Sequence, residues 1–368
     1  MSDRAGHVIV VGLSHRTARI AQREKVALPP AQARAMIQAL RGERALAEAA
    51  VLSTCNRTEL LAVAADPAHA EDILRGALVA RTRIDAAELA GATYVHHDRD
   101  AVRHLLCVAA SLDSMVVGES EIQGQVRAAL VLGREEHTVG PVLGRAFRQA
   151  LRTGRRVRRE TRIAAGAVSV SSVAADLART ALGDLTGRRM LLVGAGRTAE
   201  ATARALLRHG LGEVVVANRT PENAAQLAGR LRGRAVDLDA LTHELAAADV
   251  VISSTGAPEP LLHVADVAPA LGRHARRRLV VIDIGVPRDV DPRVGELPGV
   301  CLHDIDDLER LAAANLDGRH TEARRAQAIV DDDVRRFARH AGDRRTRFAP
   351  TPELPAQAWN RTASDVCG

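Results

Sequence analysis

The chain has 368 residues, of which 46% are hydrophobic, 26% charged and only 1% aromatic. This composition excludes a disordered chain, and the scarcity of aromatic residues excludes an RNA-binding surface built mainly on base stacking. The net charge of +6 is compatible with a polyanionic partner. No apolar run approaches the roughly 20 residues that a membrane-spanning helix needs, so we expect no contact with a membrane. The length predicts two or three domains.

The four cysteines are far apart in the sequence and form no Cys-x-x-Cys pair. That spacing argues against a zinc site and against a disulfide framework, and it fits a protein of the reducing cytoplasm. The first residues also lack the basic and apolar segments of a signal peptide. We therefore expect a cytoplasmic protein without a metal site. The cysteines are Cys55, Cys107, Cys301 and Cys367.

The first part of the chain, residues 1–162, alternates short apolar runs with helical patterns. His7–Leu13 predicts a strand, and a second apolar run, Ala49–Leu52, predicts another. Helices are predicted at Ala31–Leu40, where prolines precede the first turn, and at Ala68–Arg81. This mixture predicts an α+β domain.

The polar stretch Ser53–Glu59 separates two apolar runs and predicts a tight connection between two strands. Within it, Cys55 stands beside Thr54, Asn56 and Arg57. Arg57 and nearby backbone N–H groups would favour the thiolate, which is the nucleophilic form of cysteine. The alternative is a small apolar side chain buried at a strand end, since free cysteine is among the most buried residue types.

A helix is predicted at Asp98–Leu112, with Asp98 as its N-cap. His104 lies at the edge of the apolar stripe of this helix, where a histidine is usually structural. Histidine is also the side chain best able to exchange protons near neutral pH. The following residues, 113–125, are rich in polar side chains and contain two glycines. They predict either a loop that binds a small polar substrate or an ordinary entry into a helix, because acidic residues favour helix N-termini.

An amphipathic helix is predicted at Pro141–Arg162. One side of it is apolar, and the other carries a stripe of arginines with little except Glu160 to neutralise it. Such a stripe is either a solvent-exposed face or a surface for the backbone of a nucleic acid, and the sequence favours neither. The arginines are Arg145, Arg148, Arg152, Arg155, Arg156, Arg159 and Arg162.

Residues 163–303 predict a doubly wound parallel sheet of the Rossmann type, because apolar strands alternate with helical patterns. The first strand, Met190–Val193, leads into a glycine-rich turn and then into a helix. In this context a G-x-G-x-x-A motif binds a dinucleotide, since its glycines permit the turn and let a pyrophosphate approach the helix N-terminus. The motif consists of Gly194, Ala195, Gly196, Arg197, Thr198 and Ala199.

The second strand of this domain, Val214–Ala217, decides which cofactor we expect. An acidic residue at its end would bind the ribose 2′-hydroxyl of NAD, but the strand ends in Asn218, Arg219 and Thr220. An arginine suits the 2′-phosphate of NADP, so the expected cofactor is NADPH.

The end of the chain predicts a long helix followed by a tail. From Ile305 to about Arg339 there is no proline and only one glycine, so the stretch is compatible with one helix, which we place within residues 304–342. Residues 343–368 contain three prolines and no apolar periodicity, and we expect them to be disordered.

Together these motifs resemble those of the glutamyl-tRNA reductase family, in the order in which that family has them. The resemblance implies an α+β catalytic domain that binds glutamyl-tRNA, a Rossmann NADPH domain, and a long spinal helix that supports a homodimer. It also implies NADPH-dependent conversion of glutamyl-tRNA to glutamate-1-semialdehyde, for 5-aminolevulinate and porphyrin synthesis, and transfer of the product to an aminomutase. The matching stretches are Val11–Ala18, Leu52–Glu59, Leu112–Glu119, Gly194–Gly196, Ala217–Thr220 and Asp283–Val290.

The resemblance further implies roles for individual residues. Cys55 would be the nucleophile that forms a glutamyl thioester, and His104 matches a histidine that the family needs for full activity. The guanidinium of Arg57 would suit the free carboxylate of the substrate. The substrate-binding positions are Thr54, Asn56, Arg57, Ser114, Glu119, Ser120, Glu121 and Gln125.

Two features depart from the family's pattern. Glu121 stands where the family usually has glutamine, and it adds a carboxylate near an anionic substrate. The segment after the spinal helix is short, so we expect a truncated dimerisation module with less contact to the anticodon side of the tRNA.

Two other functions remain as alternatives. A shikimate-dehydrogenase-like oxidoreductase acting on a free small alcohol would share the glycine-rich turn and the Asn-Arg-Thr sequence but would not need Cys55. A non-catalytic relative would bind tRNA or another enzyme without turnover, and the intact Cys55 and nucleotide motifs argue against it.

Overall fold

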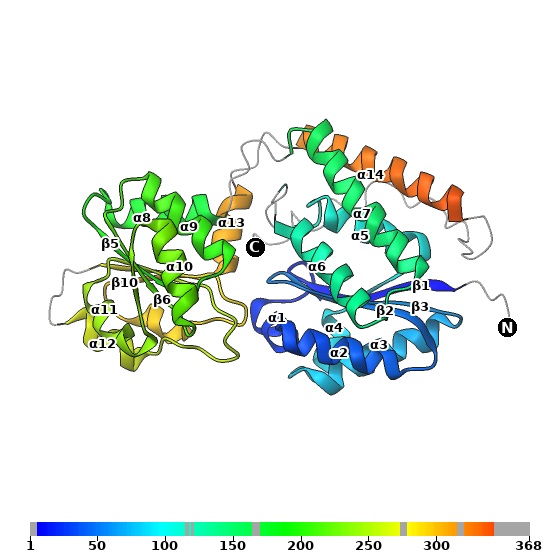
Figure 1. Ribbon diagram of the computed structural model, residues 1–368, viewed down its shortest axis with the longest axis horizontal. Coiled ribbons are helices and arrows are strands. Elements are labelled where there is room, and N and C mark those ends of the chain that lie inside the picture. The colour runs from blue at the N-terminus through cyan, green and yellow to red at the C-terminus, as the bar shows by residue number, and fades with distance from the viewer. Residues whose placement is uncertain are drawn as a thin grey trace, which may run out of the picture.

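The structure is a computed structural model, and two domains lie side by side in it, each built on its own sheet (Figure 1). Glu119, Ser120 and the predicted tail at 343–368 lie outside the described residues. The structure describes residues 6–114, 118, 121–163, 170–272, 278–314 and 320–341.

The N-terminal domain is built on a four-stranded sheet. Its strands are β1 (His7–Ser14), β2 (Leu46–Ser53), β3 (Arg57–Ala64) and β4 (Tyr94–His97). They lie in the order β2-β3-β1-β4, and each neighbouring pair is antiparallel. The predicted strands on both sides of Cys55 are therefore the hairpin β2–β3. Antiparallel strands covered by helices confirm the α+β class.

Helices cover both faces of this sheet. They are α1 (Ile20–Val26), α2 (Pro30–Gly42), α3 (Pro67–Arg81), α4 (Ala86–Ala92), α5 (Asp98–Ala109), α6 (Glu121–Glu135) and α7 (Pro141–Glu160). Val8 and Val10 of β1 face a core shared with α5, α6 and α7, whereas Ile9 and Val11 face a core shared with α2, α3 and α4. The two helical layers lie on opposite sides of the sheet (Figure 1).

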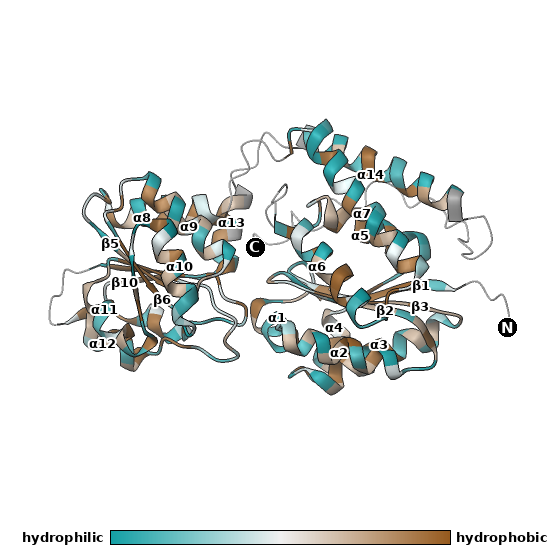
Figure 2. Ribbon diagram, viewed as in Figure 1, coloured by the Kyte–Doolittle hydropathy of each residue, from teal (hydrophilic) through white to brown (hydrophobic). Residues whose placement is uncertain are grey.

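The cores consist mainly of alanine, leucine, valine and isoleucine. Phe147 and Phe337 are the phenylalanines buried within the described residues. Each fully buried leucine or valine stabilises the fold by about 1.5–3 kcal/mol relative to an exposed one. Hydrophobic residues gather in the sheets and on the helix sides that face them, and hydrophilic residues cover the outward sides (Figure 2).

The second domain is built on a six-stranded parallel sheet. Its strands are β5 (Arg189–Val193), β6 (Glu213–Ala217), β7 (Arg234–Val236), β8 (Val250–Ser253), β9 (Leu279–Asp283) and β10 (Val300–His303). They lie in the order β10-β9-β8-β5-β6-β7, so the order reverses direction beside β5. This is the strand order of a dinucleotide-binding Rossmann sheet, and it confirms the predicted doubly wound fold.

Helices complete the second domain on both faces of its sheet. They are α8 (Val170–Leu182), α9 (Arg197–Arg208), α10 (Pro221–Leu231), α11 (Leu241–Ala247), α12 (Val264–Leu271) and α13 (Ile305–Ala314), with short 3-10 turns at Leu238–Ala240 and Pro292–Glu296. One face is covered by α8, α9, α10 and α13, and α11 and α12 pack on the other. The glycine-rich turn joins β5 to α9.

The stretch predicted as one long helix contains two described helices, α13 and α14 (His320–Ala341). Ile305 and Leu308 of α13 belong to the core of the second domain. Val330 and Phe337 of α14 belong to the core of the N-terminal domain, where α14 packs on α5 and α7. Residues 315–319, between the two helices, lie outside the described residues.

The predicted role of Asp98 as an N-cap is wrong. His97 is the N-cap residue of α5, and Asp98 is the first residue of the helix. The carboxylate of Asp98 instead accepts hydrogen bonds from the backbone N–H of Val8, at 3.1 Å, and from the imidazole of His7, at 2.8 Å. Because β4 runs directly into α5, this side chain reaches the start of β1 and joins the two elements.

Candidate active site

Cys55 lies in the tight turn between β2 and β3, and Thr54 shapes that turn. The backbone N–H of Thr54 donates to the carbonyl of Arg57 at 2.8 Å, and Thr54 Oγ1 accepts from the backbone N–H groups of Asn56 and Arg57, each at 3.1 Å. The Cys55 side chain is half-buried and packs against the apolar core of the second domain. The turn therefore presents Cys55 to the nucleotide-binding domain.

Arg57 anchors a buried group of charges behind the turn. Its side chain is 2% exposed, and Nη1 lies 2.7 Å from Glu59 Oε1 and 3.1 Å from Asp113 Oδ2, while Nη2 donates to the carbonyl of Asp113. Arg16 pairs with the other oxygen of Asp113, at 2.7 Å. Burial would raise the pKa of the Asp113 carboxyl, but Arg57 and Arg16 hold that pKa below its usual range. The Arg57 guanidinium is thus already bound by two carboxylates.

Glu59, on β3, is the centre of this network. Its carboxylate is fully buried and accepts hydrogen bonds from Tyr94 Oη at 2.5 Å and from His104 Nε2 at 2.8 Å, in addition to Arg57. Gly12 of β1 stands opposite both Glu59 on β3 and Tyr94 on β4, and a Cβ there would lie 2.7 Å from Glu59 Cγ. The missing side chain at Gly12 lets Glu59 and Tyr94 meet across the central strand.

The charge on Glu59 fixes the orientation of the His104 proton. Burial would raise the pKa of the Glu59 carboxyl, but His104 and Arg57 hold that pKa well below its usual range, so Glu59 is ionised and only accepts hydrogen bonds. His104 Nε2 must then carry a proton, and Nδ1, on the other side of the ring, lies 4.0 Å from Asp113 Oδ2. His96 stacks on His104 with ring centroids 4.6 Å apart, and burial together with His104 lowers the pKa of His96 to about 4.

The predicted substrate-binding residues lie in different settings. Ser114 is buried directly after Asp113, and Gln125 is half-buried on α6. The carboxylate of Glu121, at the start of α6, accepts a hydrogen bond from Thr198 Oγ1 at 2.9 Å. Glu121 is therefore directed toward the glycine-rich turn of the second domain.

The glycine-rich turn has the backbone that a pyrophosphate site needs. Gly194 has φ of +98°, and its N–H donates to the carbonyl of Ala217 at 2.8 Å. A Cβ at Gly194 would lie 2.2 Å from the carbonyl oxygen of Ser254, so only glycine fits. Gly196 is the N-cap of α9 and supplies no side-chain acceptor, which leaves the N–H groups of the first helical turn directed out of the helix end.

The other predicted cofactor residues surround this turn. Ala199 is buried in α9, whereas Arg197 is exposed and its guanidinium lies against Gly124 of α6. The Thr198 hydroxyl donates its hydrogen bond to the Glu121 carboxylate. Arg219 is exposed at the end of β6, between Asn218, whose amide donates to the Thr220 carbonyl at 3.0 Å, and the N-cap of α10.

Two buried aspartates join the carboxyl ends of β8 and β9. Asp283 accepts from the backbone N–H groups of Gly285 and Val290, each at 2.9 Å, and Asp289 accepts from Ser253 Oγ at 2.9 Å and from the Thr255 N–H at 2.7 Å. Burial and the neighbouring Asp289 raise the pKa of Asp283 to about 8. These bonds fix the loops at the sheet edge where ligands bind in this fold.

The arginine stripe of α7 divides into two parts. Arg156 pairs with Asp332 at 2.9 Å and Asp333 at 2.8 Å, and Arg145 lies over the ring of Phe337. These contacts correct the expectation that little except Glu160 neutralises the stripe, because the acidic residues come from α14, far along the chain. The exposed arginines are Arg148, Arg152, Arg155, Arg159 and Arg162.

Comparison with known proteins identifies the family. A family model described as "Glutamyl-tRNAGlu reductase, N-terminal domain" matches residues 11–161, and one described as "Shikimate / quinate 5-dehydrogenase" matches residues 176–311. The glutamyl-tRNA reductase of Rubrobacter xylanophilus is 47% identical over 331 residues, which are 90% of this chain and 76% of that relative. The chain belongs to the glutamyl-tRNA reductase family.

Other members of the glutamyl-tRNA reductase family are also similar. The glutamyl-tRNA reductase of Pseudomonas aeruginosa is 43% identical over 329 residues, which are 89% of this chain and 78% of that relative. The solved structure of glutamyl-tRNA reductase from Methanopyrus kandleri is 36% identical, covers 90% of this chain and 80% of its own, and has a TM-score of 0.49. As a member of this family the chain is an enzyme, an oxidoreductase with a nicotinamide-nucleotide-binding domain.

The sequence motifs do not point to all the residues of the network around Arg57. Glu59 and Asp113 stand inside the matching stretches without a predicted role, and Tyr94 lies outside those stretches. A charged residue among the apolar neighbours of a strand is the sequence signal for Glu59.

Among the described residues, no helix is long and apolar enough to cross a membrane, and no cluster of three or more His, Cys, Asp or Glu side chains could hold a metal ion.

Proposed function

We propose that this enzyme reduces glutamyl-tRNA(Glu) to glutamate-1-semialdehyde with NADPH and releases free tRNA, for 5-aminolevulinate and porphyrin synthesis. The observation that supports this most strongly is the position of Cys55. It stands at the tip of a hairpin of one domain and packs against the core of the nucleotide-binding domain. A nucleophile that must first take an acyl group and then present it to a reductant needs that position.

The proposed chemistry starts with attack of the Cys55 thiolate on the carbonyl carbon of the glutamyl ester. A carbon–sulfur bond forms, the carbon–oxygen bond to the tRNA breaks, and the terminal ribose hydroxyl leaves with a proton. NADPH supplies the hydride that converts this thioester to the aldehyde and returns Cys55 as a thiolate. His104, whose ring is oriented by the bond from Nε2 to Glu59, is suited to exchange a proton with the leaving or forming oxygen.

NADPH fits the residues of the second domain. Gly194 and Gly196 leave room for a pyrophosphate at the N-terminus of α9, whereas a methyl group at Gly194 would collide with the backbone of Ser254. Arg219 offers an exposed guanidinium at the end of β6 for the 2′-phosphate. Thr198 would hold the glycine-rich turn in place through its hydrogen bond to Glu121 as well as through contact with the cofactor.

For the substrate we propose a site around the Cys55 turn that includes Thr54, Asn56, Ser114 and Gln125. Arg57 acts in this proposal mainly through Glu59 and Asp113, because those carboxylates occupy its guanidinium. Glu121 contributes to the contact between the domains, since its carboxylate accepts from Thr198. Glu119 and Ser120 stay predictions from the family resemblance.

The proposed partners follow from the substrate and the product. The exposed arginines of α7 would contact the phosphates of the tRNA. An aminomutase would take the reactive aldehyde, and two copies of the chain would associate through the C-terminal helical region in the cytoplasm.

Light scattering in solution tests the homodimer: a mass of about twice the 39.2 kDa of one chain supports it, and a mass of one chain contradicts it.

Turnover of purified protein tests the function itself. With glutamyl-tRNA(Glu) and NADPH, we expect semialdehyde and deacylated tRNA in equal amounts. With shikimate or quinate in place of the tRNA substrate, we expect no oxidation by NADP. The opposite pattern, or semialdehyde formation that persists in Cys55→Ser, would favour an oxidoreductase of free small alcohols.

A further inference from the structure

Helix α1 of the N-terminal domain carries two adjacent side chains that reach the nucleotide-binding domain. The guanidinium of Arg23 is 2% exposed and pairs through Nη2 with the carboxylate of Asp306, in the first turn of α13. The next residue, Glu24, pairs with Arg288, in the loop after β9. One short helix therefore holds two separate segments of the other domain.

Arg23 also holds the turn that carries Cys55. Its Nη1 donates to the carbonyl oxygen of Cys55 at 3.1 Å and to Asn56 Oδ1 at 2.9 Å. Asn56 is itself buried. One planar guanidinium thus joins the backbone of Cys55, the side chain of its neighbour and a carboxylate of the other domain, and the fork of this rigid group fixes their relative positions.

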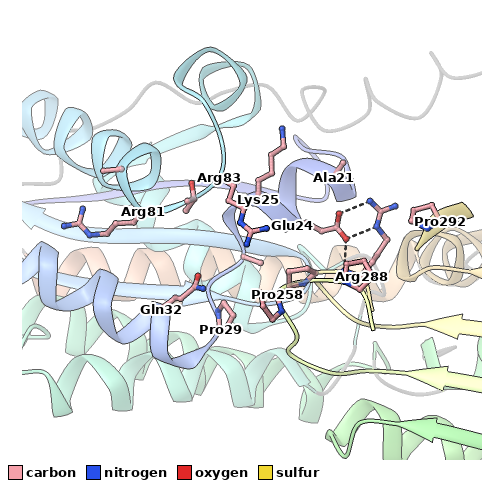
Figure 3. A pocket seen from close by; sticks show the side chains of 15 residues that line it. Ala21, Glu24, Lys25, Pro29, Gln32, Arg81, Arg83, Pro258, Arg288 and Pro292 are labelled. Carbon is pink, nitrogen blue, oxygen red and sulfur yellow. Dashed lines mark hydrogen bonds and ion pairs between the residues drawn. The ribbon is translucent and has the colours of Figure 1, made fainter. Parts of the chain in front are cut away.

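Glu24 makes a contact of the same kind that does not touch the turn. Its Oε1 accepts from the backbone N–H of Arg288 at 2.7 Å and from Nε at 2.8 Å, and its Oε2 accepts from Nη2 at 2.8 Å. Figure 3 shows this fork on the wall of a cavity of about 700 Å³ that both domains line. The Glu24–Arg288 pair therefore contributes to the contact between the domains but not to the geometry of the Cys55 turn.

The two pairs have different consequences when the domains separate. A guanidinium cannot give up its proton, and a buried cation without a carboxylate partner is costly, so Arg23 would turn toward solvent or another acceptor once Asp306 moved away. The Cys55 carbonyl and the Asn56 side chain would then lose the donor that Arg23 supplies. Loss of the Glu24–Arg288 pair would leave the turn unchanged.

We propose that Arg23 is a positioning residue that couples docking of the nucleotide-binding domain, through Asp306, to the geometry of the Cys55 turn. The docked domain fixes the guanidinium, and the guanidinium fixes the backbone that carries the thiolate. The acyl group on Cys55 is then held in the orientation for reduction only while the cofactor domain is in contact. This inference rests on the proposed function, because it assumes an acyl group on Cys55.

The test measures how the acyl-enzyme divides between reduction and hydrolysis. Wild type, Arg23→Gln, Asp306→Asn and the double variant are acylated with labelled glutamyl-tRNA, and NADPH is added at saturation. The products are semialdehyde, from reduction, and glutamate, from hydrolysis by water. Asp306 is 28% exposed, so Asp306→Asn disturbs folding less than a change at the buried Arg23 and keeps the test valid if Arg23→Gln does not fold.

We expect Arg23→Gln and Asp306→Asn each to lower the ratio of semialdehyde to glutamate by at least about tenfold, since misplacing a reacting group costs up to about a hundredfold. The double variant should be no worse than the worse single variant, because both remove one coupled unit. Asp306→Glu should restore part of the ratio. Glu24→Gln, the matched control, should raise the KM for NADPH without changing the ratio at saturation.

Four outcomes overturn the inference. Equal effects of Glu24→Gln and Arg23→Gln on the ratio would make Arg23 an ordinary docking contact, and additive effects in the double variant would remove the coupling. If wild type forms no acyl group on Cys55, the proposed function fails and this inference fails with it. If wild type acylates and reduces normally while Arg23→Gln and Asp306→Asn keep the wild-type ratio, only the inference fails.

Discussion

His104 Nε2 lies 2.8 Å from Glu59 Oε1, and this bond keeps a proton on that nitrogen of the imidazole. Replacing the carboxylate with an amide in Glu59→Gln removes the charge that holds the proton on His104 Nε2 and pairs with the buried Arg57. We expect kcat to fall by roughly a hundredfold, the scale of a lost proton-transfer group, with a smaller change in KM.

The control for this variant is Glu48→Gln. Glu48 is also a buried carboxylate on a strand of the same sheet, but it accepts from the backbone N–H groups of Val142 and Leu143 at the start of α7. The Glu48→Gln protein should have a lower free energy of unfolding, but its folded fraction should keep the kcat of the unaltered protein. Equal losses of kcat in the two variants, at equal fractions folded, would remove Glu59 from the proposed chemistry.

Tyr94 is the single tyrosine of the sequence, so its ionisation can be followed by ultraviolet absorbance without interference. Burial and the Glu59 carboxylate hold the pKa of Tyr94 well above its ordinary value. Because the pKa of Tyr94 is higher in the folded protein than in the unfolded chain, the Tyr94–Glu59 hydrogen bond contributes its full stability below the unfolded pKa of about 10. That contribution falls as the pH rises above the unfolded pKa. We expect no tyrosinate signal near pH 10 in the folded protein, a signal near about pH 10 in urea, and an earlier folded-state signal in Glu59→Gln. Native titration at the ordinary pKa would show that the Tyr94–Glu59 bond does not form.

The elements of this fold follow from local pattern, whereas the network around Glu59 depends on register. Apolar runs and glycine spacing predict the strand at His7–Leu13, the hairpin around Cys55 and the Gly194 turn, and the structure confirms all three. That Gly12 stands between Glu59 and Tyr94 follows only from how β1 pairs with β3 and β4. Pairing of this kind joins residues far apart in the chain, and no local signal encodes it.

The acidic partners of α7 show the same limit. Arg156 and Asp333 are separated by a large part of the chain, and their contact depends on α14 packing on α7. From the sequence, Arg156 is indistinguishable from Arg152, although the structure pairs the first and exposes the second. In the same way, Arg23 is one of many arginines until α1 is placed between the domains.

The exposed part of the α7 stripe predicts a salt-dependent contact with tRNA. We expect the combined substitution of Arg148, Arg152 and Arg155 by glutamine to weaken binding and to reduce the slope of log K against log salt by about 0.7–0.9 for each phosphate that the protein no longer neutralises. Arg179→Gln, at an exposed arginine of α8, is the control and should leave the slope unchanged. An unchanged slope in the triple variant would identify the stripe as a solvent-exposed face.

Arg219 is the residue on which the preference for NADPH rests. In Arg219→Gln we expect the KM for NADPH to rise by roughly tenfold, the scale of a charge-assisted phosphate contact, and the KM for NADH to stay unchanged. Arg208→Gln, at the end of α9, should change neither value. Equal KM values for NADPH and NADH in the unaltered protein would contradict the assignment of NADPH as the cofactor.

We propose that Cys55 carries the substrate's acyl group, and capture of that group on the protein is the direct test. The protein is mixed with glutamyl-tRNA labelled on glutamate, without NADPH, and digested for peptide mass analysis. We expect a glutamyl adduct on the peptide that contains Cys55, removable by hydroxylamine, absent in Cys55→Ser and converted to semialdehyde when NADPH is added. An adduct on another residue, or semialdehyde formation by Cys55→Ser, would contradict the proposed role of Cys55.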